Sequence, residues 1–304
     1  MRLGVLDVGS NTVHLQIMDA YVGSAPIPYE SFKQEVRLAE YLDNHGAISE
    51  SGIEQLIKAI SEVFHSSHAI ELDETLAFAT SAIREATNSM EVLTRVENQT
   101  GIKLEVLSGQ EEASLTFLAA RRWFGWHMGD LLVLDIGGGS LEIAYGVDES
   151  PSYTQSVMLG AGRLTRDFLE GDPFSDKSLG RLAQHIWETL DPIAQDLRNA
   201  TRASAVGTSK TFRTLRRLQT EFLPELGNNL TLEGLDLIAQ KLQKMTLKQR
   251  RDLPGVSQGR AQQIVAGAMV ARATLEKLNI ESVIQCPWAL REGIILHRID
   301  WIHK

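Results

Sequence analysis

Residues 3–15 read Leu-Gly-Val-Leu-Asp-Val-Gly-Ser-Asn-Thr-Val-His-Leu, and residues 131–143 read Leu-Leu-Val-Leu-Asp-Ile-Gly-Gly-Gly-Ser-Leu-Glu-Ile. In both copies an apolar run ends at an aspartate, Asp7 or Asp135, a turn of small residues follows, and a second apolar run begins. This pattern predicts a β-hairpin whose turn leaves backbone N–H groups uncovered, so that an anion can approach them. A strand-end aspartate can hold a hard cation such as Mg²⁺, which in turn binds phosphate oxygens. Two copies therefore predict two related half-domains with phosphate between them.

Composition is typical of a soluble globular protein. The chain has 304 residues, of which 43% are hydrophobic and 23% charged, and this length suffices for two domains. The net charge of −9 argues against a nucleic-acid partner. The single cysteine, Cys286, excludes an internal disulfide and favours a reducing compartment. No apolar run approaches the roughly 20 residues that span a bilayer, so we expect a cytoplasmic protein without a membrane partner.

Short strand-like runs alternate with segments of helical apolar spacing along the chain, which predicts α/β sheets. Residues 51–69 are predicted to form a helix that begins with a capping box of Ser51 and Glu54. We predict two further long helices, from residue 83 to about residue 100 and over 231–251.

The predicted domain boundary falls near residues 121–129, because no linker-like segment separates the two hairpin copies elsewhere. Domain I is expected at 1–124 and domain II at 125–304. The last helix, at about 288–304, is expected to pack back on domain I.

Seven segments together resemble the exopolyphosphatase / guanosine pentaphosphate phosphatase (Ppx/GppA) family. In chain order they are 6–15, 35–40, 79–86, 107–113, 134–142, 207–210 and 290–294. The resemblance covers essentially the whole chain and implies the fold of the superfamily of actin, sugar kinases and acetate kinase. The expected architecture is two ribonuclease H-like domains with a cleft between them, which Asp7 and Asp135 face.

The resemblance also implies which residues form the site. The phosphate-binding residues of the two turns are expected to be Gly9, Ser10 and Asn11 in the first and Gly137, Gly138, Gly139 and Ser140 in the second. A plain tight hairpin is the alternative for either turn alone, whereas a spaced pair with an aspartate before each favours phosphate. Asp7, Asp135 and Glu142 are expected to hold Mg²⁺, or Mn²⁺ in its place, and Asp135 is also expected to be catalytic.

Glu111 and Glu112 follow a Ser-Gly pair and open a predicted helix. Acidic residues in a first helical turn commonly serve only the helix dipole. In the family, the second glutamate of the Glu-Glu-Ala motif is the catalytic base, which here is Glu112. Kinases of the superfamily are not expected to carry this motif, because they activate a substrate hydroxyl and not a water, so Glu112 favours a hydrolase.

Cations are needed to bind a polyanion. Arg84 and Lys210 are expected to bind substrate, since both follow predicted strand ends within the motif segments. Other cations in or beside the turns and motif segments are interpreted as solubilising, as exposed arginines commonly are, and they are Arg37, Arg163 and Arg291. His14 is interpreted as a buried, hydrogen-bonded imidazole and not as a ligand.

The expected function is Mg²⁺-dependent hydrolysis of the terminal phosphoanhydride of inorganic polyphosphate. The alternative is removal of the 5′ γ-phosphate of guanosine pentaphosphate, which the same site can perform. A small-molecule kinase is less favoured, because residues 207–210 read Gly-Thr-Ser-Lys where superfamily kinases commonly place the Gly-Gly pair that contacts adenosine. A nucleotide sensor without turnover is disfavoured by the intact acidic set. The chain is expected to lack the C-terminal helical domains of longer family members, and with them the surface those domains add for long chains or dimerisation. A homodimer stays open as a partner.

Overall fold

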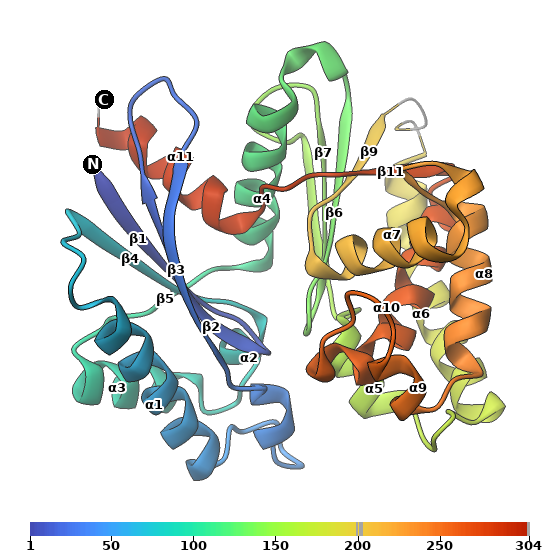
Figure 1. Ribbon diagram of the computed structural model, residues 1–304, viewed down its shortest axis with the longest axis horizontal. Coiled ribbons are helices and arrows are strands. Elements are labelled where there is room, and N and C mark those ends of the chain that lie inside the picture. Colours follow the sequence, from blue (N-terminus) through green and yellow to red (C-terminus); the bar gives the residue numbers. More distant parts are fainter. Residues whose placement is uncertain (199, 201–202, 303–304) are drawn as a thin grey trace. The chain divides into compact units, whose positions relative to one another are not determined.

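The computed structural model describes residues 1–198, 200 and 203–302, and it separates into two compact units (Figure 1). Unit 1 consists of Met1–Leu115 and Leu290–Lys304, and unit 2 consists of Thr116–Ala289. Helix α4 (Gly109–Phe124) belongs to both units, because the division falls within it. Among the described residues, no helix combines the length and the apolarity needed to cross a membrane.

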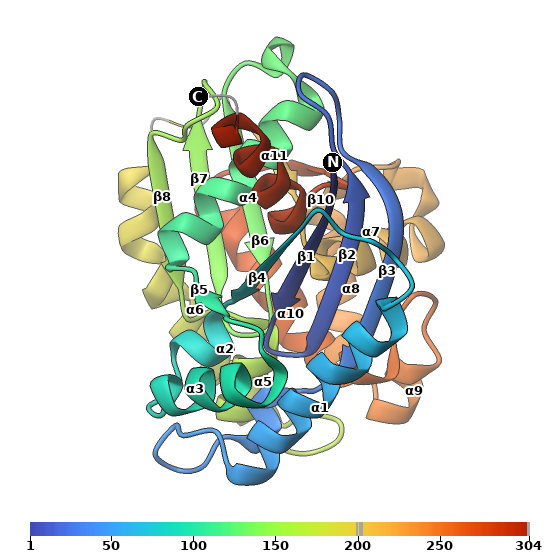
Figure 2. The ribbon, with the colours of Figure 1, turned by 90° about the vertical axis from the view of Figure 1, so that its left-hand side faces the viewer.

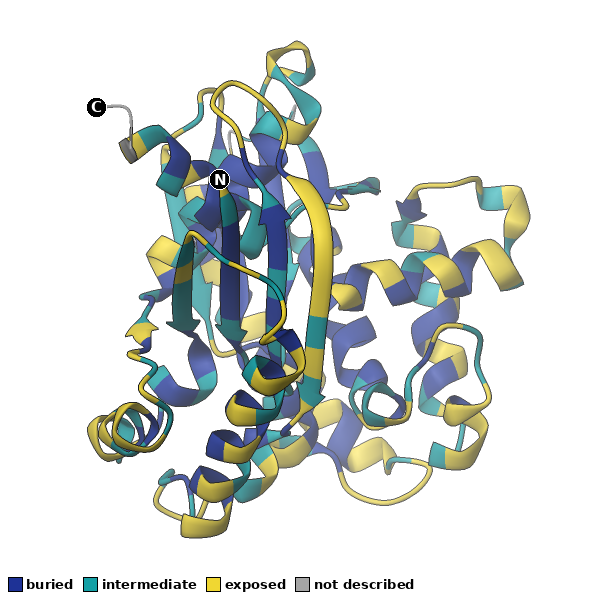
Figure 3. Cartoon of the chain, turned by 60° about the vertical axis from the view of Figure 1, so that its left-hand side comes forward, coloured by how far each residue is buried: buried dark blue, intermediate teal, exposed yellow. Residues whose placement is uncertain are grey.

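Unit 1 is built on a sheet of strand order β3-β2-β1-β4-β5. Its elements are β1 (Arg2–Val8), β2 (Thr12–Asp19), β3 (Ile27–Glu35), η1 (Leu38–Tyr41), α1 (Glu50–Ser67), β4 (Glu74–Ala79), α2 (Ser81–Arg84), α3 (Ser89–Thr100), β5 (Glu105–Val106), the start of α4, and α11 (Leu290–Ile302). Helix α1 contacts β2 and β3 (Figure 2). Strand β3 forms a largely exposed edge (Figure 3).

Alternation along β1 explains how the sheet of unit 1 is covered on both faces. Leu6 and Val8 belong to the core that also contains the apolar side of α1, whereas Leu3 and Val5 pack with residues of α11. Asp7 is separated from Leu3 and Val5 by even numbers of residues along the strand, and its side chain therefore lies on the α11 face. The last helix thus completes unit 1 and covers the face that carries the aspartate.

Unit 2 repeats this topology in a sheet of order β10-β11-β9-β6-β7-β8. Its elements after α4 are η2 (Trp126–Met128), β6 (Leu131–Ile136), β7 (Leu141–Gly146), β8 (Tyr153–Val157), α5 (Ala161–Phe168), α6 (Asp176–Asp196), β9 (Ser204–Gly207), α7 (Lys210–Phe222), η3 (Pro224–Leu226), β10 (Leu230–Thr231), α8 (Leu232–Gln243), α9 (Leu247–Arg251), α10 (Gln258–Lys277) and β11 (Ser282–Gln285). In both units three antiparallel strands are followed by parallel ones. The predicted pair of related α/β domains is confirmed.

Three local predictions about helices are wrong. Helix α1 is capped by Ser49, whose side chain accepts the N–H of Gly52 at 3.4 Å, and not by Ser51. The helix predicted from residue 83 is interrupted before α3, because the Asn88 side chain bonds both backbone groups of Ile48, at 2.8 and 2.9 Å.

The helix predicted over residues 231–251 divides into α8 and α9. Thr246 begins α9 in a capping box with Gln249. The Thr-x-x-Gln spacing of this box is visible in the sequence.

Candidate functional site

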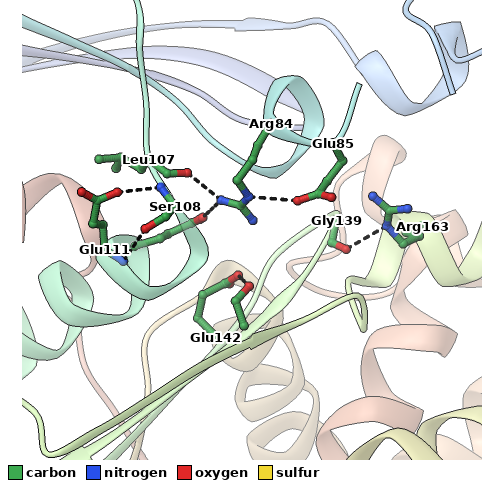
Figure 4. Close-up of polar contacts among 10 residues, drawn as sticks. Arg84, Glu85, Leu107, Ser108, Glu111, Gly139, Glu142 and Arg163 are labelled. Atoms are coloured by element: carbon green, nitrogen blue, oxygen red, sulfur yellow. Dashed lines mark hydrogen bonds and ion pairs between the residues drawn. The ribbon is translucent and has the colours of Figure 1, made fainter. Parts of the chain in front are cut away.

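The second turn packs its carbonyl groups against the start of α5. The carbonyls of Gly137 and Gly138 accept α5 amides at 2.9–3.0 Å. Arg163 Nε donates to the carbonyl of Gly139 at 3.1 Å (Figure 4). Only glycine fits at position 160, where a Cβ would lie 2.2 Å from the carbonyl carbon of Gly139. The orientation of these peptide groups is therefore fixed by α5.

This packing turns the amides of the second turn to the opposite side. A trans peptide holds its C=O and N–H in opposite directions, so the N–H groups of Gly138, Gly139 and Ser140 point away from α5. Within the described part of the chain, the amides of Gly138 and Gly139 donate to no protein acceptor. Successive amides directed to one side are the arrangement that binds anions. Phosphate binding by this turn stays a prediction, and the turn has the geometry that such binding requires.

Asp135 and Glu142 face each other across β6 and β7. Directly opposed residues of an antiparallel pair share one face, with Cβ atoms about 5 Å apart. Thr208 Oγ1 donates to Asp135 Oδ2 at 2.5 Å, and Ser156 Oγ donates to Glu142 Oε1 at 2.8 Å. These hydroxyl donors orient the two carboxylates, so this hairpin presents two oriented acidic groups on one face.

The first turn is organised differently. The carbonyl of Asn11 accepts the backbone N–H groups of Val36 and Arg37 at 3.0 and 3.1 Å. Gly9 closes the turn through its N–H, and Ser10 is buried. Arg37, in the left-handed conformation at φ 51°, comes from the 35–40 motif. That motif therefore braces the first turn as α5 braces the second.

Asp7 is paired with a cation within unit 1. Arg291 Nη1 of α11 donates to Asp7 Oδ2 at 2.9 Å. The residue opposite Asp7 in the register is His14, which is half-buried. Burial, together with the nearby charges of Arg291 and Lys33, lowers the pKa of His14 to about 3. His14 is thus a neutral imidazole at neutral pH, but it has no hydrogen-bond partner among the described residues, which corrects the predicted hydrogen-bonded imidazole.

Glu112 is held by Arg84 within unit 1. Arg84 Nη1 donates to Glu112 Oε2 at 3.0 Å. It also donates to the Leu107 carbonyl at 2.9 Å, and Arg84 Nε donates to Glu85 at 2.9 Å (Figure 4). Burial lowers the pKa of Arg84, but the bonds to the two glutamates outweigh burial and raise it overall. Arg84 therefore fixes the position of the predicted base, a role that the sequence did not indicate.

Glu111 has a different environment from its neighbour. Its carboxylate accepts the N–H of Ser108 at 2.8 Å, and Ser108 Oγ accepts the N–H of Glu111 at 3.2 Å. These hydrogen bonds lower the pKa of Glu111. This reciprocal pair is a capping box at the start of α4.

Two cations lie at the end of the unit 2 sheet. Lys210, a predicted substrate-binding residue, is exposed at the first position of α7, after the cap residue Ser209. Arg260, which the sequence analysis did not identify, donates from Nη1 to Thr211 Oγ1 at 3.3 Å. Burial lowers its pKa to about 10, against the attraction of Asp135. No local pattern in the sequence distinguishes Arg260 from other arginines of helices.

The predicted metal ligands differ in how well they fit Mg²⁺. The described residues contain no group of three or more acidic, histidine or cysteine side chains gathered for a metal ion. Mg²⁺ does not require one, because it binds through one or two carboxylates together with water and substrate phosphates. Asp135 and Glu142 offer such a pair of hard oxygen donors. Asp7 fits less well, because Arg291 competes with any cation for its carboxylate.

The profile of the Ppx/GppA phosphatase family matches residues 23–301. The chain belongs to this family. Exopolyphosphatase 1 of Mycobacterium tuberculosis is 48% identical over 305 residues, which span 99% of this chain and 89% of that protein. Exopolyphosphatase 1 of Mycobacterium leprae is 47% identical, with 99% and 90% covered. The family membership indicated by the seven segments is confirmed.

Solved structures of the family share the fold. An exopolyphosphatase from Cytophaga hutchinsonii has a TM-score of 0.86 at 25% identity, covering 99% of this chain and 98% of that one. The Ppx/GppA family member of Aquifex aeolicus has a TM-score of 0.81 at 25% identity, covering 100% and 99%. The two-unit architecture is therefore that of family members along nearly their whole length.

Proposed function

We propose that the protein is an exopolyphosphatase, a phosphoanhydride hydrolase that releases phosphate from the end of inorganic polyphosphate. The observation that carries the proposal is the 48% identity to an exopolyphosphatase over 99% of this chain. The anion-directed amides of Gly138 and Gly139 support it, because a terminal phosphoryl group offers several oxygens to such donors.

Glu112 is the proposed general base. It would orient and deprotonate the water that attacks the terminal phosphoryl group. Arg84 fixes the carboxylate through the bond at 3.0 Å between Arg84 Nη1 and Glu112 Oε2. The leaving group is a phosphate chain of low basicity, so no strong general acid is needed. Catalysis then depends on positioning and on charge stabilisation.

Asp135 and Glu142 are the proposed holders of Mg²⁺, with Mn²⁺ as a substitute. When bound, the metal would supply positive charge that neutralises the phosphoryl oxygens. Thr208 and Ser156 orient the two carboxylates through their hydroxyl groups. Asp7 is reassigned from metal ligand to partner of Arg291, because an arginine already compensates its charge.

The guanosine pentaphosphate reaction remains the alternative, because it cleaves the same kind of terminal phosphoanhydride. A cytoplasmic location is proposed with either substrate, since the single, buried Cys286 suits a reducing compartment.

A substrate panel tests the proposal. The purified chain is incubated with Mg²⁺ and, separately, long-chain polyphosphate, guanosine pentaphosphate, and ATP with acceptor sugars, and phosphate release and sugar phosphorylation are measured. We expect phosphate release from polyphosphate with the highest kcat/KM, and its loss in excess chelator. Preference for guanosine pentaphosphate would select the alternative, and phosphorylation of an acceptor would select a kinase. Full activity in chelator would refute the metal proposal.

A further inference from the structure

The arginines of this acidic chain differ in whether a carboxylate neutralises them. Those paired with an aspartate or glutamate include Arg2, Arg37, Arg95, Arg122, Arg166, Arg181, Arg272 and Arg298. Arg213 and Arg217 of α7 are exposed, and no carboxylate of the described chain lies within ion-pair distance of either or of Arg260. A chain of net charge −9 has more acidic than basic side chains. Arginines that have no carboxylate partner in such a chain therefore suggest binding of an external anion.

Helix packing holds Arg260 at one end of the unit 2 sheet. Helices α7 and α10 contact each other (Figure 1). They approach closely because Gly267 of α10 has no side chain, and a Cβ there would lie 2.8 Å from Thr211 Cγ2. Thr211 Oγ1 donates to the Ile136 carbonyl at 2.8 Å and accepts from Arg260 Nη1 at 3.3 Å. Arg260 is thereby fixed beside the end of β6, the strand that carries Asp135.

The remaining two arginines extend from this point along α7. Arg213 follows Thr211 by two positions, and its charge repels that of Arg260, which keeps a positive charge at neutral pH. Arg217 lies one helical turn further, about 6 Å along the axis. Its stem is packed against Gly255, where a Cβ would lie 2.5 Å from Arg217 Cδ. Neighbouring guanidinium groups of like charge are favourable together when an anion lies between them.

We propose that Arg260, Arg213 and Arg217 form a chain-binding subsite, which takes phosphate groups of inorganic polyphosphate other than the one that is cleaved. The proposal rests on the proposed function, since it assigns the remainder of the same substrate. Guanidinium groups donate two parallel hydrogen bonds to phosphate oxygens. A linear polyanion that repeats one group can engage a row of arginines, whereas a short phosphate compound reaches fewer of them.

The test compares tripolyphosphate with long-chain polyphosphate. The double variant Arg213→Gln/Arg217→Gln is assayed beside the wild type and a matched control, Lys177→Gln/Arg181→Gln, which removes two exposed cations from α6. A hydrogen bond to a charged group contributes about 1.5–3 kcal/mol, and 1.4 kcal/mol is a factor of ten. We expect KM for the long chain to rise about tenfold or more relative to KM for tripolyphosphate, with the control near wild type. Arg213→Lys/Arg217→Lys should recover part of the lost affinity, because lysine restores the positive charge but not the two parallel hydrogen bonds of a guanidinium group.

Equal effects on both substrates, no effect, or the same effect in the control would overturn the subsite. Direct binding of long-chain polyphosphate to each variant, measured by calorimetry at two salt concentrations, separates this outcome from failure of the proposed function. If the wild type releases no phosphate, the proposed function fails. The subsite then stands only if the double variant binds the chain at least about tenfold more weakly, and falls if it binds as the wild type does. A lower salt dependence of binding in the double variant is also expected.

Discussion

The two hairpins are copies of one sequence pattern, but they carry different side chains at matching positions. In the first, Asp7 is opposite His14, and in the second, Asp135 is opposite Glu142. Asp7 pairs with Arg291 and lies near a neutral imidazole, whereas Asp135 accepts a hydroxyl and shares its face with a second carboxylate. A repeated backbone therefore does not repeat its side-chain chemistry: the second hairpin places two carboxylates opposite each other, whereas the first places a carboxylate opposite an imidazole.

Each unit also positions its carboxylates with a different kind of donor. The predicted base of unit 1, Glu112, is held by the guanidinium of Arg84, and the acidic pair of unit 2 is held by the hydroxyls of Thr208 and Ser156. The proposed base therefore lies in unit 1, and the proposed metal carboxylates lie in unit 2. The variants below test that division.

The largest effect is expected for Glu112. Glu112→Gln keeps the size and a hydrogen-bonding group but removes the base, so kcat on polyphosphate should fall roughly 10²–10⁴-fold while substrate binding persists. Glu111→Gln is the control, because glutamine can replace glutamate in the capping box with Ser108, and it should cost far less. Near-wild-type turnover by Glu112→Gln would remove the base from unit 1 and move the kinase alternative ahead.

The next effect separates the two aspartates. Asp135→Asn should lower kcat by about 10²-fold and raise the Mg²⁺ concentration needed for half-maximal rate, because even outer partners of metal sites contribute 10–100-fold. Asp7→Asn should leave the Mg²⁺ dependence close to wild type, since its charge faces Arg291. Rates measured across a Mg²⁺ titration check both variants. A larger Mg²⁺ shift in Asp7→Asn than in Asp135→Asn would reverse the comparison.

The smallest effect concerns the neutral imidazole of the first hairpin. His14 has a folded pKa of about 3 and an unfolded value near 6.5. The unfolded chain therefore binds the extra proton between these values, so that His14 destabilises the fold as pH falls below about 6.5. Between pH 7 and pH 5, the free energy of unfolding of His14→Asn should therefore fall by up to about 2 kcal/mol less than that of the wild type.

Urea unfolding at several pH values measures this effect, with His45→Asn in an exposed loop as the control. If the free energy of unfolding of His14→Asn depends on pH as that of the wild type does, the assignment of His14 as a neutral group is contradicted.

The sequence predicted the sheets and the turns well because their signals are local. Strand alternation, turn glycines and the spacing of Asp7 and Asp135 all lie within short segments. The partners of the site residues could not be predicted in this way. Arg291 is 284 positions from Asp7, and Thr208 is 73 positions from Asp135, so only the folded chain brings them together. Two of the predicted helices are interrupted in the structure. One of these breaks could not be predicted for the same reason, because Asn88 bonds Ile48 across 40 positions.

The most direct test of the account is to follow the oxygen of the attacking water. Each hydrolysis of long-chain polyphosphate in ¹⁸O-water with Mg²⁺ places one solvent oxygen in the product whose phosphorus was attacked, and mass spectrometry locates it. The account predicts one ¹⁸O in every phosphate released from the chain end, because a water activated by Glu112 attacks the terminal phosphorus. Released phosphate without ¹⁸O, or release that requires an added acceptor, would contradict it.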